Sequence, residues 1–353
     1  MKLSYRGRML AELMTPAGAA SGRLLLKLVP VLCLAGGMVL AQQKTTSRAT
    51  GEEAGGLRHA QLRCVSTSGP FGNVNRNDAR AALKVLYDLL AQKQGFLLDS
   101  SVDVFDSLAG VRARLQSHST EVIMTDLGEF LELENSGLVT PVLTDARAGQ
   151  VGARYPYVLL VNPASRVTTV AGLRGKSILV TSRGGSGTGA AWLDVFLDKG
   201  KLGRLATFFA SVQFPDRAQA CVLSLFFNKV DACVVDEVNL NLAREMNPQL
   251  GRLIVLARSR PMIESVIAVP VERRPFQKEL IDAMLTLQEE PRGRQLLMVF
   301  KTDRLVRIQP GDLDSGRELW RDYNRLVGIT SHRPAGSVGV AEINRADRTK
   351  AKD

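Results

Sequence analysis

The fold class of this chain is decided by one stretch, Leu173-Arg-Gly-Lys-Ser-Ile-Leu-Val-Thr-Ser-Arg-Gly-Gly-Ser-Gly-Thr-Gly-Ala-Ala-Trp192. Within it, Ser177–Thr181 is a short apolar run, which is typical of a buried strand. The next segment, Ser182–Gly189, contains four glycines and three hydroxyl residues, and Ala190–Asp198 favours a helix with Trp192 in the core. The stretch therefore predicts a strand, a glycine-rich turn and a helix in immediate succession.

A glycine-rich turn of this kind suits an anion. Glycine lets the backbone approach a ligand closely, and the first helical turn directs N–H groups at it, with the positive end of the helix dipole behind them. The hydroxyls of Ser186 and Thr188 add donors. The alternative is that the turn only caps the helix. The candidate anion-binding residues are Ser182, Arg183, Ser186, Gly187, Thr188 and Gly189.

The N-terminus predicts export. An apolar run, Leu28–Leu40, is preceded by Arg6, Arg8, Arg23 and Lys27, and Val39-Leu-Ala41 at its end is a small-residue cleavage site. This layout is that of a secretory signal peptide, and the run is short for a membrane-spanning helix. We therefore expect a signal peptide over residues 1–41, a flexible leader over 42–60 and a periplasmic protein. The alternative is an uncleaved anchor.

Composition excludes some classes of function. Without residues 1–41, which hold five of the 46 basic residues and one of the 35 acidic residues, the net charge falls from +11 to +7. Basic residues are spread along the chain and aromatic residues are few, so nucleic-acid binding has little support. Cys64, Cys221 and Cys233 remain after cleavage, and their sequence patterns favour buried apolar thiols over disulfides, with at least one thiol free. No spacing indicates a metal site.

Strand patterns alternate with helix patterns between residues 61 and 327, which predicts α/β units with largely parallel sheets. The expected strands cover 61–67, 96–102, 121–124, 139–143, 157–161, 177–181, 211–214, 231–235, 253–257 and 265–269. The expected helices cover 79–91, a segment ending near 116, 127–133, 190–198, 218–228, a segment after 237, 276–288, 293–299 and 313–326.

Three stretches resemble one family. They are Leu173–Val180, Ser186–Gly189 and Gln219–Asp236, the last containing Phe226-Phe-Asn-Lys-Val-Asp-Ala-Cys-Val-Val-Asp236. Through them, residues 61–327 resemble the periplasmic substrate-binding proteins of phosphate, phosphite and phosphonate (PhnD-like) ABC transporters. The resemblance implies a type II periplasmic binding fold: two α/β lobes with mainly parallel sheets, joined by a hinge. It implies lobe 1 over 61–155, lobe 2 over 156–257 and a return to lobe 1 over 258–327. The residues that follow are charged, small and unpatterned, which predicts a disordered tail over 328–353.

The fold places the ligand beyond the carboxyl ends of the strands. Besides the glycine-rich turn, the loops Ser66–Asn73, Thr125–Asp126 and Asp236–Glu237 meet this description. Asp126 and Asp236 also suit helix caps, which is the alternative role for both. The remaining candidate ligand-binding residues are Ser68, Gly69, Thr125, Asp126 and Asp236.

The resemblance implies a monomeric binding protein, and not an enzyme, with no cofactor and no catalytic residue. It would capture a small oxyanion (phosphate, phosphite or phosphonate-like) for an ABC permease and ATPase. An alternative partner is a membrane sensor kinase, and an alternative ligand is a different small molecule. Gly185-x-Gly187-x-x-Ala190 superficially fits a dinucleotide fingerprint, but the acidic residue expected about twenty positions later is missing. A nucleotide-dependent oxidoreductase is therefore a remote alternative.

Overall fold

A computed structural model describes residues 58–71, 76–93, 96–147, 154–181, 187–215, 217–300 and 302–328. The predicted signal peptide, nearly all of the leader and all of the tail from residue 329 lie outside them, as do Ser182, Arg183 and Ser186 of the glycine-rich turn.

One mixed sheet has the strand order β11-β4-β10-β3-β1-β2. Strand β1 runs parallel to β2 and β3, whereas the pairs among β3, β10, β4 and β11 are antiparallel. The strands are β1 (Arg58–Thr67), β2 (Phe96–Phe105), β3 (Val122–Asp126), β4 (Val139–Ala146), β10 (Ser265–Pro270) and β11 (Arg304–Arg307).

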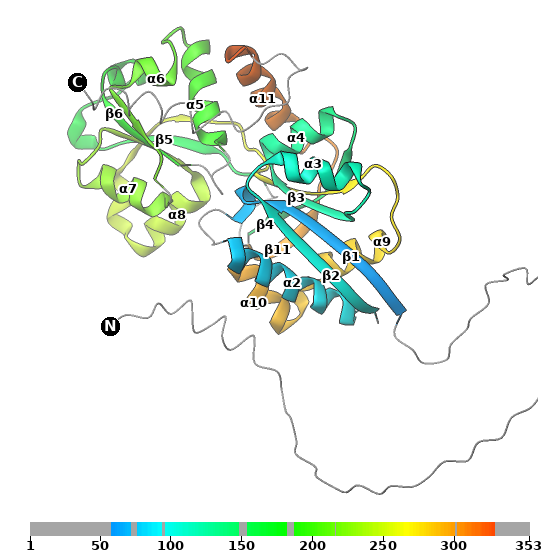
Figure 1. Cartoon of the computed structure of the whole chain (residues 1–353). Helices are drawn as coiled ribbons and strands as arrows, with labels where there is room; N and C mark the ends of the chain where they lie inside the picture. Colours follow the sequence, from blue (N-terminus) through cyan, green and yellow to red (C-terminus); the bar gives the residue numbers. More distant parts are fainter. Residues whose placement is uncertain are drawn as a thin grey trace, which may run out of the picture. The chain divides into compact units, whose positions relative to one another are not determined.

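Helices cover both faces of this sheet, because alternate residues of its strands point to opposite sides. Val122 and Ile267 belong to a hydrophobic cluster with α2 (Arg76–Lys93), α9 (Gln277–Leu285) and α10 (Pro291–Val299). Their neighbours Ile123 and Val266 belong to a second cluster with α3 (Leu108–Gln116) and α4 (Leu127–Asn135). Figure 1 shows α3 and α4 on one side of the sheet and α2 and α10 on the other.

The second sheet has the order β7-β6-β8-β5-β9. Here β6 is parallel to β7 and β8, and β5 is antiparallel to β8 and β9. Every residue of β5 and β8 is buried, as expected for strands covered on both faces. The strands are β5 (Tyr157–Val161), β6 (Ser177–Val180), β7 (Ser211–Gln213), β8 (Ala232–Asp236) and β9 (Ile254–Arg258).

The helices of this sheet also form two layers. One hydrophobic cluster joins Tyr157 and Leu159 to Trp192 of α5 (Thr188–Lys199), and α6 (Leu205–Phe208) adds to it. The other joins Val158 and Leu160 to α7 (Ala218–Phe226) and α8 (Glu237–Met246). Trp192 is a core residue, as predicted.

The last helix, α11 (Asp314–Leu326), contacts elements of both sheets. Its Leu319 and Tyr323 pack in the cluster of α5, and Asp322 pairs with Lys199 at 2.6 Å. Toward α4, Arg317 pairs with Glu134 at 2.6 Å.

Two layered sheets built from strand–helix units confirm the α/β class. Both sheets are mixed, where mainly parallel sheets were expected, because β10 and β5 reach them without a crossover helix and can run antiparallel to their neighbours.

The structure corrects three expectations. Cys221 of α7 and Cys233 of β8 form a disulfide, with Cα atoms 6.0 Å apart, where two thiols were expected. The sequence does not reveal that α7 packs directly on β8. Cys64 is free and buried, and burial raises its pKa to about 12.

Strand β11 was not predicted, since it is four residues long at a sheet edge. The helix expected over 276–288 ends at Leu285 and continues as a 3-10 turn, Leu287–Glu289.

Candidate functional site

The first half of the candidate site lies at one edge of the first sheet. Strands β1 and β3 are parallel, so Thr67 and Asp126 end at the same edge, and Ser68 and Gly69 follow Thr67. A Cβ atom on Gly69 would lie only 2.9 Å from Asp126 Oδ2, so this close approach requires glycine. The predicted loops of this sheet therefore come together, with Ser68 exposed beside them.

Asp126 is the N-cap of α4. Its side chain accepts a hydrogen bond from Glu129 N at 2.9 Å, and Glu129 Oε2 accepts one from Asp126 N at 3.3 Å. This reciprocal pair is a capping box. The Thr67 hydroxyl donates to the same Glu129 oxygen. The alternative role of Asp126 as a helix cap is confirmed.

Buried carboxyl groups define the electrostatics of this half. Burial raises the pKa of Asp126 well above its ordinary value, and the charges of Glu129 and Glu264 raise it further. Burial also raises the pKa of Glu129, although the Thr67 hydrogen bond opposes this. Glu264 itself is 3% exposed. Thr125 is buried, and its Oγ1 has no hydrogen-bond partner in the part of the chain that the structure describes.

The second half lies at the carboxyl edge of the second sheet, where the parallel strands β6 and β8 end. Thr181 follows β6, and both its N–H and its hydroxyl donate hydrogen bonds to Val234 O, at 2.9 and 3.0 Å. Helix α5 then begins after Gly187, whose φ of 72° places it in the left-handed region that glycine adopts without strain. Thr188 and Gly189 are buried in the first turn. This turn carries no acidic residue.

Asp236 ends β8 and caps α8. Its carboxylate accepts hydrogen bonds from Asn239 N at 2.9 Å and from Asn239 Nδ2 at 2.5 Å, and the residue is 2% exposed. The next residue, Glu237, pairs with Arg258 of β9. The N-terminus of α8 is thus occupied by the protein's own carboxylate, as that of α4 is.

The structure brings together Ser68, Gly69, Thr125 and Asp126 at the first sheet, and Gly187, Thr188, Gly189 and Asp236 at the second. The other three candidates, Ser182, Arg183 and Ser186, lie outside the described residues. Sequence reasoning missed Thr67, Glu129 and Glu264. The spacing Asp126-x-x-Glu129 is that of a capping box and would have identified Glu129. Glu264 left no signal, since it lies far from Asp126 in the sequence.

The described ranges hold no group of three or more His, Cys, Asp or Glu side chains suited to a metal ion. They also contain no helix with the length and apolar content needed to cross a membrane.

Residues 70–313 match the family described as the phosphonate periplasmic substrate-binding proteins of ABC transporters. The chain belongs to this family. Members are transport proteins of the periplasm and not enzymes, and membership implies a small-molecule ligand and ABC partners in the membrane. No curated protein matches the chain.

Solved structures show that the fold is that of type II periplasmic binding proteins. XAC2383 from Xanthomonas citri, bound to ATP, superposes with a TM-score of 0.57 at 16% identity, covering 76% of this chain and 99% of its own. PhnD1 from Prochlorococcus marinus, in complex with methylphosphonate, has a TM-score of 0.53 at 12% identity, with the same coverage. A binding protein of a phosphonate ABC transporter from Pseudomonas aeruginosa has a TM-score of 0.53 at 12% identity, covering 83% of this chain and 96% of its own.

Proposed function

We propose that this phosphonate-family binding protein captures a small oxyanion (phosphate, phosphite or a phosphonate) at the N-terminus of α5 and delivers it to an ABC permease and ATPase. One observation carries the proposal. Helices α4 and α8 begin at aspartates that fill their own N-termini, whereas α5 begins at Gly187 with no acid in its first turn. The positive end of a helix dipole favours an anion, and α5 alone among these three begins without an aspartate cap.

The ligand contacts follow from this position. The N–H groups of Gly187, Thr188 and Gly189 and the hydroxyls of Thr188 and Ser186 would donate to the oxyanion. Charge-assisted hydrogen bonds of this kind contribute about 1.5–3 kcal/mol each. PhnD1, which has the same fold, is solved with methylphosphonate, and this supports the ligand class.

Asp126 supplies a different contact. Because its pKa is raised, its carboxyl group stays protonated above the pH at which an ordinary aspartate ionises. A protonated carboxyl group donates a hydrogen bond and does not repel an anion. In our proposal the ligand lies between lobe 1 (61–155 and 258–327) and lobe 2 (156–257). Lobe 1 contacts the ligand through Asp126, with Ser68, Gly69 and Thr125, and Asp236 of lobe 2 lies beside the ligand. The crossings between the lobes near 155–159 and 256–261 act as the hinge.

The export step belongs to the same proposal. Residues 1–41 would be removed as a signal peptide, and the mature monomer would begin near Gln42. N-terminal sequencing and light scattering of the purified periplasmic protein test this. An intact Leu28–Leu40 segment would show an anchored protein instead.

Calorimetric titration with phosphate, phosphite, methylphosphonate, sulfate and an amino acid tests the ligand. We expect a phosphorus oxyanion to bind one site per chain. Thr188→Val should weaken it about tenfold or more, because the side chain keeps its volume and loses one donor. Thr188→Ser keeps the hydroxyl and serves as the matched control. If only cations or apolar compounds bind, the oxyanion assignment is wrong.

A further inference from the structure

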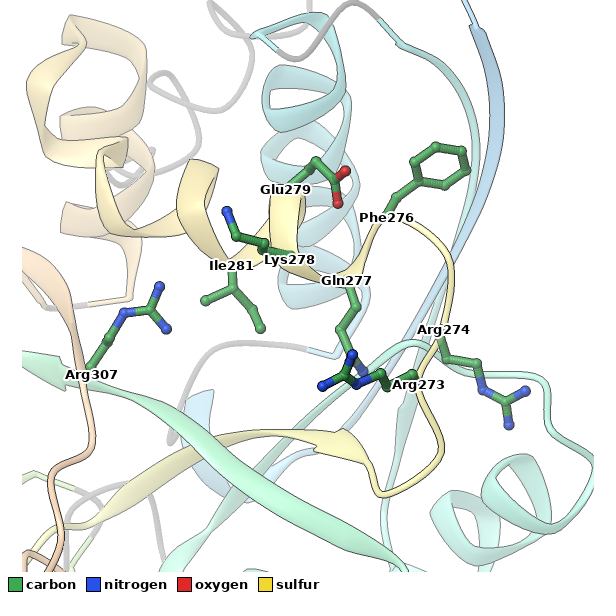
Figure 2. Close-up of a pocket in the computed structure, with 8 residues that line it drawn as sticks. All are labelled: Arg273, Arg274, Phe276, Gln277, Lys278, Glu279, Ile281 and Arg307. Atoms are coloured by element: carbon green, nitrogen blue, oxygen red, sulfur yellow. The ribbon is translucent and has the colours of Figure 1, made fainter.

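A separate basic site lies on α9, the loop before it and β11, none of which contributes to the candidate site. There the structure forms a cavity of about 380 Å³, which lies in the size range of small-molecule sites. We call it the basic pocket. Its lining residues, drawn in Figure 2, are Arg273, Arg274, Phe276, Gln277, Lys278, Glu279, Ile281 and Arg307.

Cations outnumber carboxylates in the basic pocket. Four lining residues are basic and only Glu279 is acidic. Lys278 Nζ and Arg307 Nη2 share the single carboxylate of Asp282, at 2.7 and 2.8 Å. Arg273 is exposed and has neither an ion pair nor a side-chain hydrogen bond within the described ranges. An excess of positive charge in a concave site attracts anions.

Two N–H donors of the basic pocket are buried without a partner. Gln277 Nε2 and Arg274 Nε make no hydrogen bond to any described residue. Arg274 is nevertheless held in place, since its Nη2 bonds to Glu272 at 3.1 Å and to His118 Nδ1 at 2.9 Å. A buried donor without an acceptor costs free energy, so an acceptor atom of a ligand would be favoured here.

The backbone beside these donors is strained. Phe276, the residue before α9, has φ 60° and ψ 8°, a left-handed conformation that is costly for a bulky side chain. Strain of this kind persists where the surroundings enforce it, and it concentrates at ligand sites. Here it turns the chain so that Arg273 and Gln277 lie together at the start of α9.

The positions of the polar groups define the ligand. Figure 2 shows Arg307 and the Lys278 ammonium on one side of Ile281, and Gln277 with Arg273 on the other. We propose that the basic pocket binds a small molecule with two anionic groups, phosphate or carboxylate. One group contacts Arg307 and Lys278, the other contacts Arg273 and Gln277, and the part between them lies on Ile281.

Calorimetric titration of the full mature chain with pyrophosphate and with succinate tests this proposal. One of the two should bind a single site whose affinity falls with salt, and the probe that binds tells phosphate from carboxylate. The same site should persist in Thr188→Val, because that residue belongs to α5. Arg273→Gln and Arg307→Gln should each weaken it about tenfold, and the double variant should abolish it.

Arg292→Gln is the matched control, since Arg292 is exposed on α10 and lies outside the basic pocket. It removes the same charge and should leave the affinity unchanged. Arg273→Lys, which keeps the charge, should bind more tightly than Arg273→Gln. The proposal is overturned if neither probe binds, if the double variant binds as the wild type does, or if Arg292→Gln weakens binding equally. Melting curves of all variants check that each is folded.

Discussion

Helices α4 and α8 differ from α5 at the N-cap position, although all three follow a buried strand and begin at the carboxyl edge of a sheet. In α4 and α8 that position is an aspartate, Asp126 or Asp236, which accepts a hydrogen bond from the first turn. In α5 it is Gly187, which has no side chain to do so. The difference teaches that an aspartate carboxylate caps the first turn of α4 and of α8, whereas Gly187 supplies no carboxylate to α5.

The largest expected effect comes from making α5 resemble α4 and α8. Gly187→Asp would place a carboxylate where we expect the oxyanion, so repulsion and the loss of a favourable contact should together weaken binding roughly 100-fold, or about 3 kcal/mol. Calorimetric titration with the best-binding oxyanion measures it. Gly187→Asn is the control, because asparagine tolerates the left-handed region and has a similar size without the charge. Equal affinities of Gly187→Asp and Gly187→Asn would show that the carboxylate charge does not cause the loss of affinity.

The converse change tests α8. Asp236→Ala leaves the first turn of α8 without its cap and should lower the free energy of unfolding by about 1–2 kcal/mol, measured by urea denaturation. Asp236→Asn retains an oxygen that accepts a hydrogen bond from the backbone, so its free energy of unfolding should fall by less. If Asp236→Ala and Asp236→Asn lower the free energy of unfolding equally, the cap seen in the structure contributes nothing to stability.

The pH dependence of stability tests the buried carboxyl groups of α4. The pKa values of Asp126 and Glu129 are raised in the folded protein, so the folded state holds more protons than the unfolded state above the ordinary pKa of a carboxyl group, near 4. The free energy of unfolding should therefore fall as pH rises from about 4 through the raised values.

Asp126→Asn removes one of these groups and keeps a capping side chain, so it should flatten this decline. Urea denaturation between pH 4 and 8 measures the slope. Glu129→Gln should flatten it less, since the Thr67 hydrogen bond offsets part of the shift at Glu129. An unchanged slope in Asp126→Asn would mean that Asp126 ionises normally.

Local sequence signals located most of the fold. The apolar run of Tyr157–Val161 and the helical spacing of the α5 region were predicted within a few residues, because periodicity and turn residues act over short distances. The same signals failed for β11, which is only four residues long at a sheet edge, and for the disulfide, whose cysteines are joined only because α7 packs on β8.

For the candidate site, local signals identified Asp126, Asp236 and the glycines before α5. They identified neither Glu129 nor Glu264. Glu129 was recoverable from its spacing to Asp126, whereas Glu264 reaches α4 only because β10 pairs with β3 in the sheet.

The sequence by itself determined the order of most strands and helices and placed an aspartate before α4 and α8 and a glycine before α5, since both depend on residues that are near neighbours in the chain. Only the tertiary structure decided which carboxyl groups are buried together, which cysteines pair, and that Arg307 lies beside α9. These outcomes depend on desolvation and contact between distant segments, which exist only once the sheets have assembled.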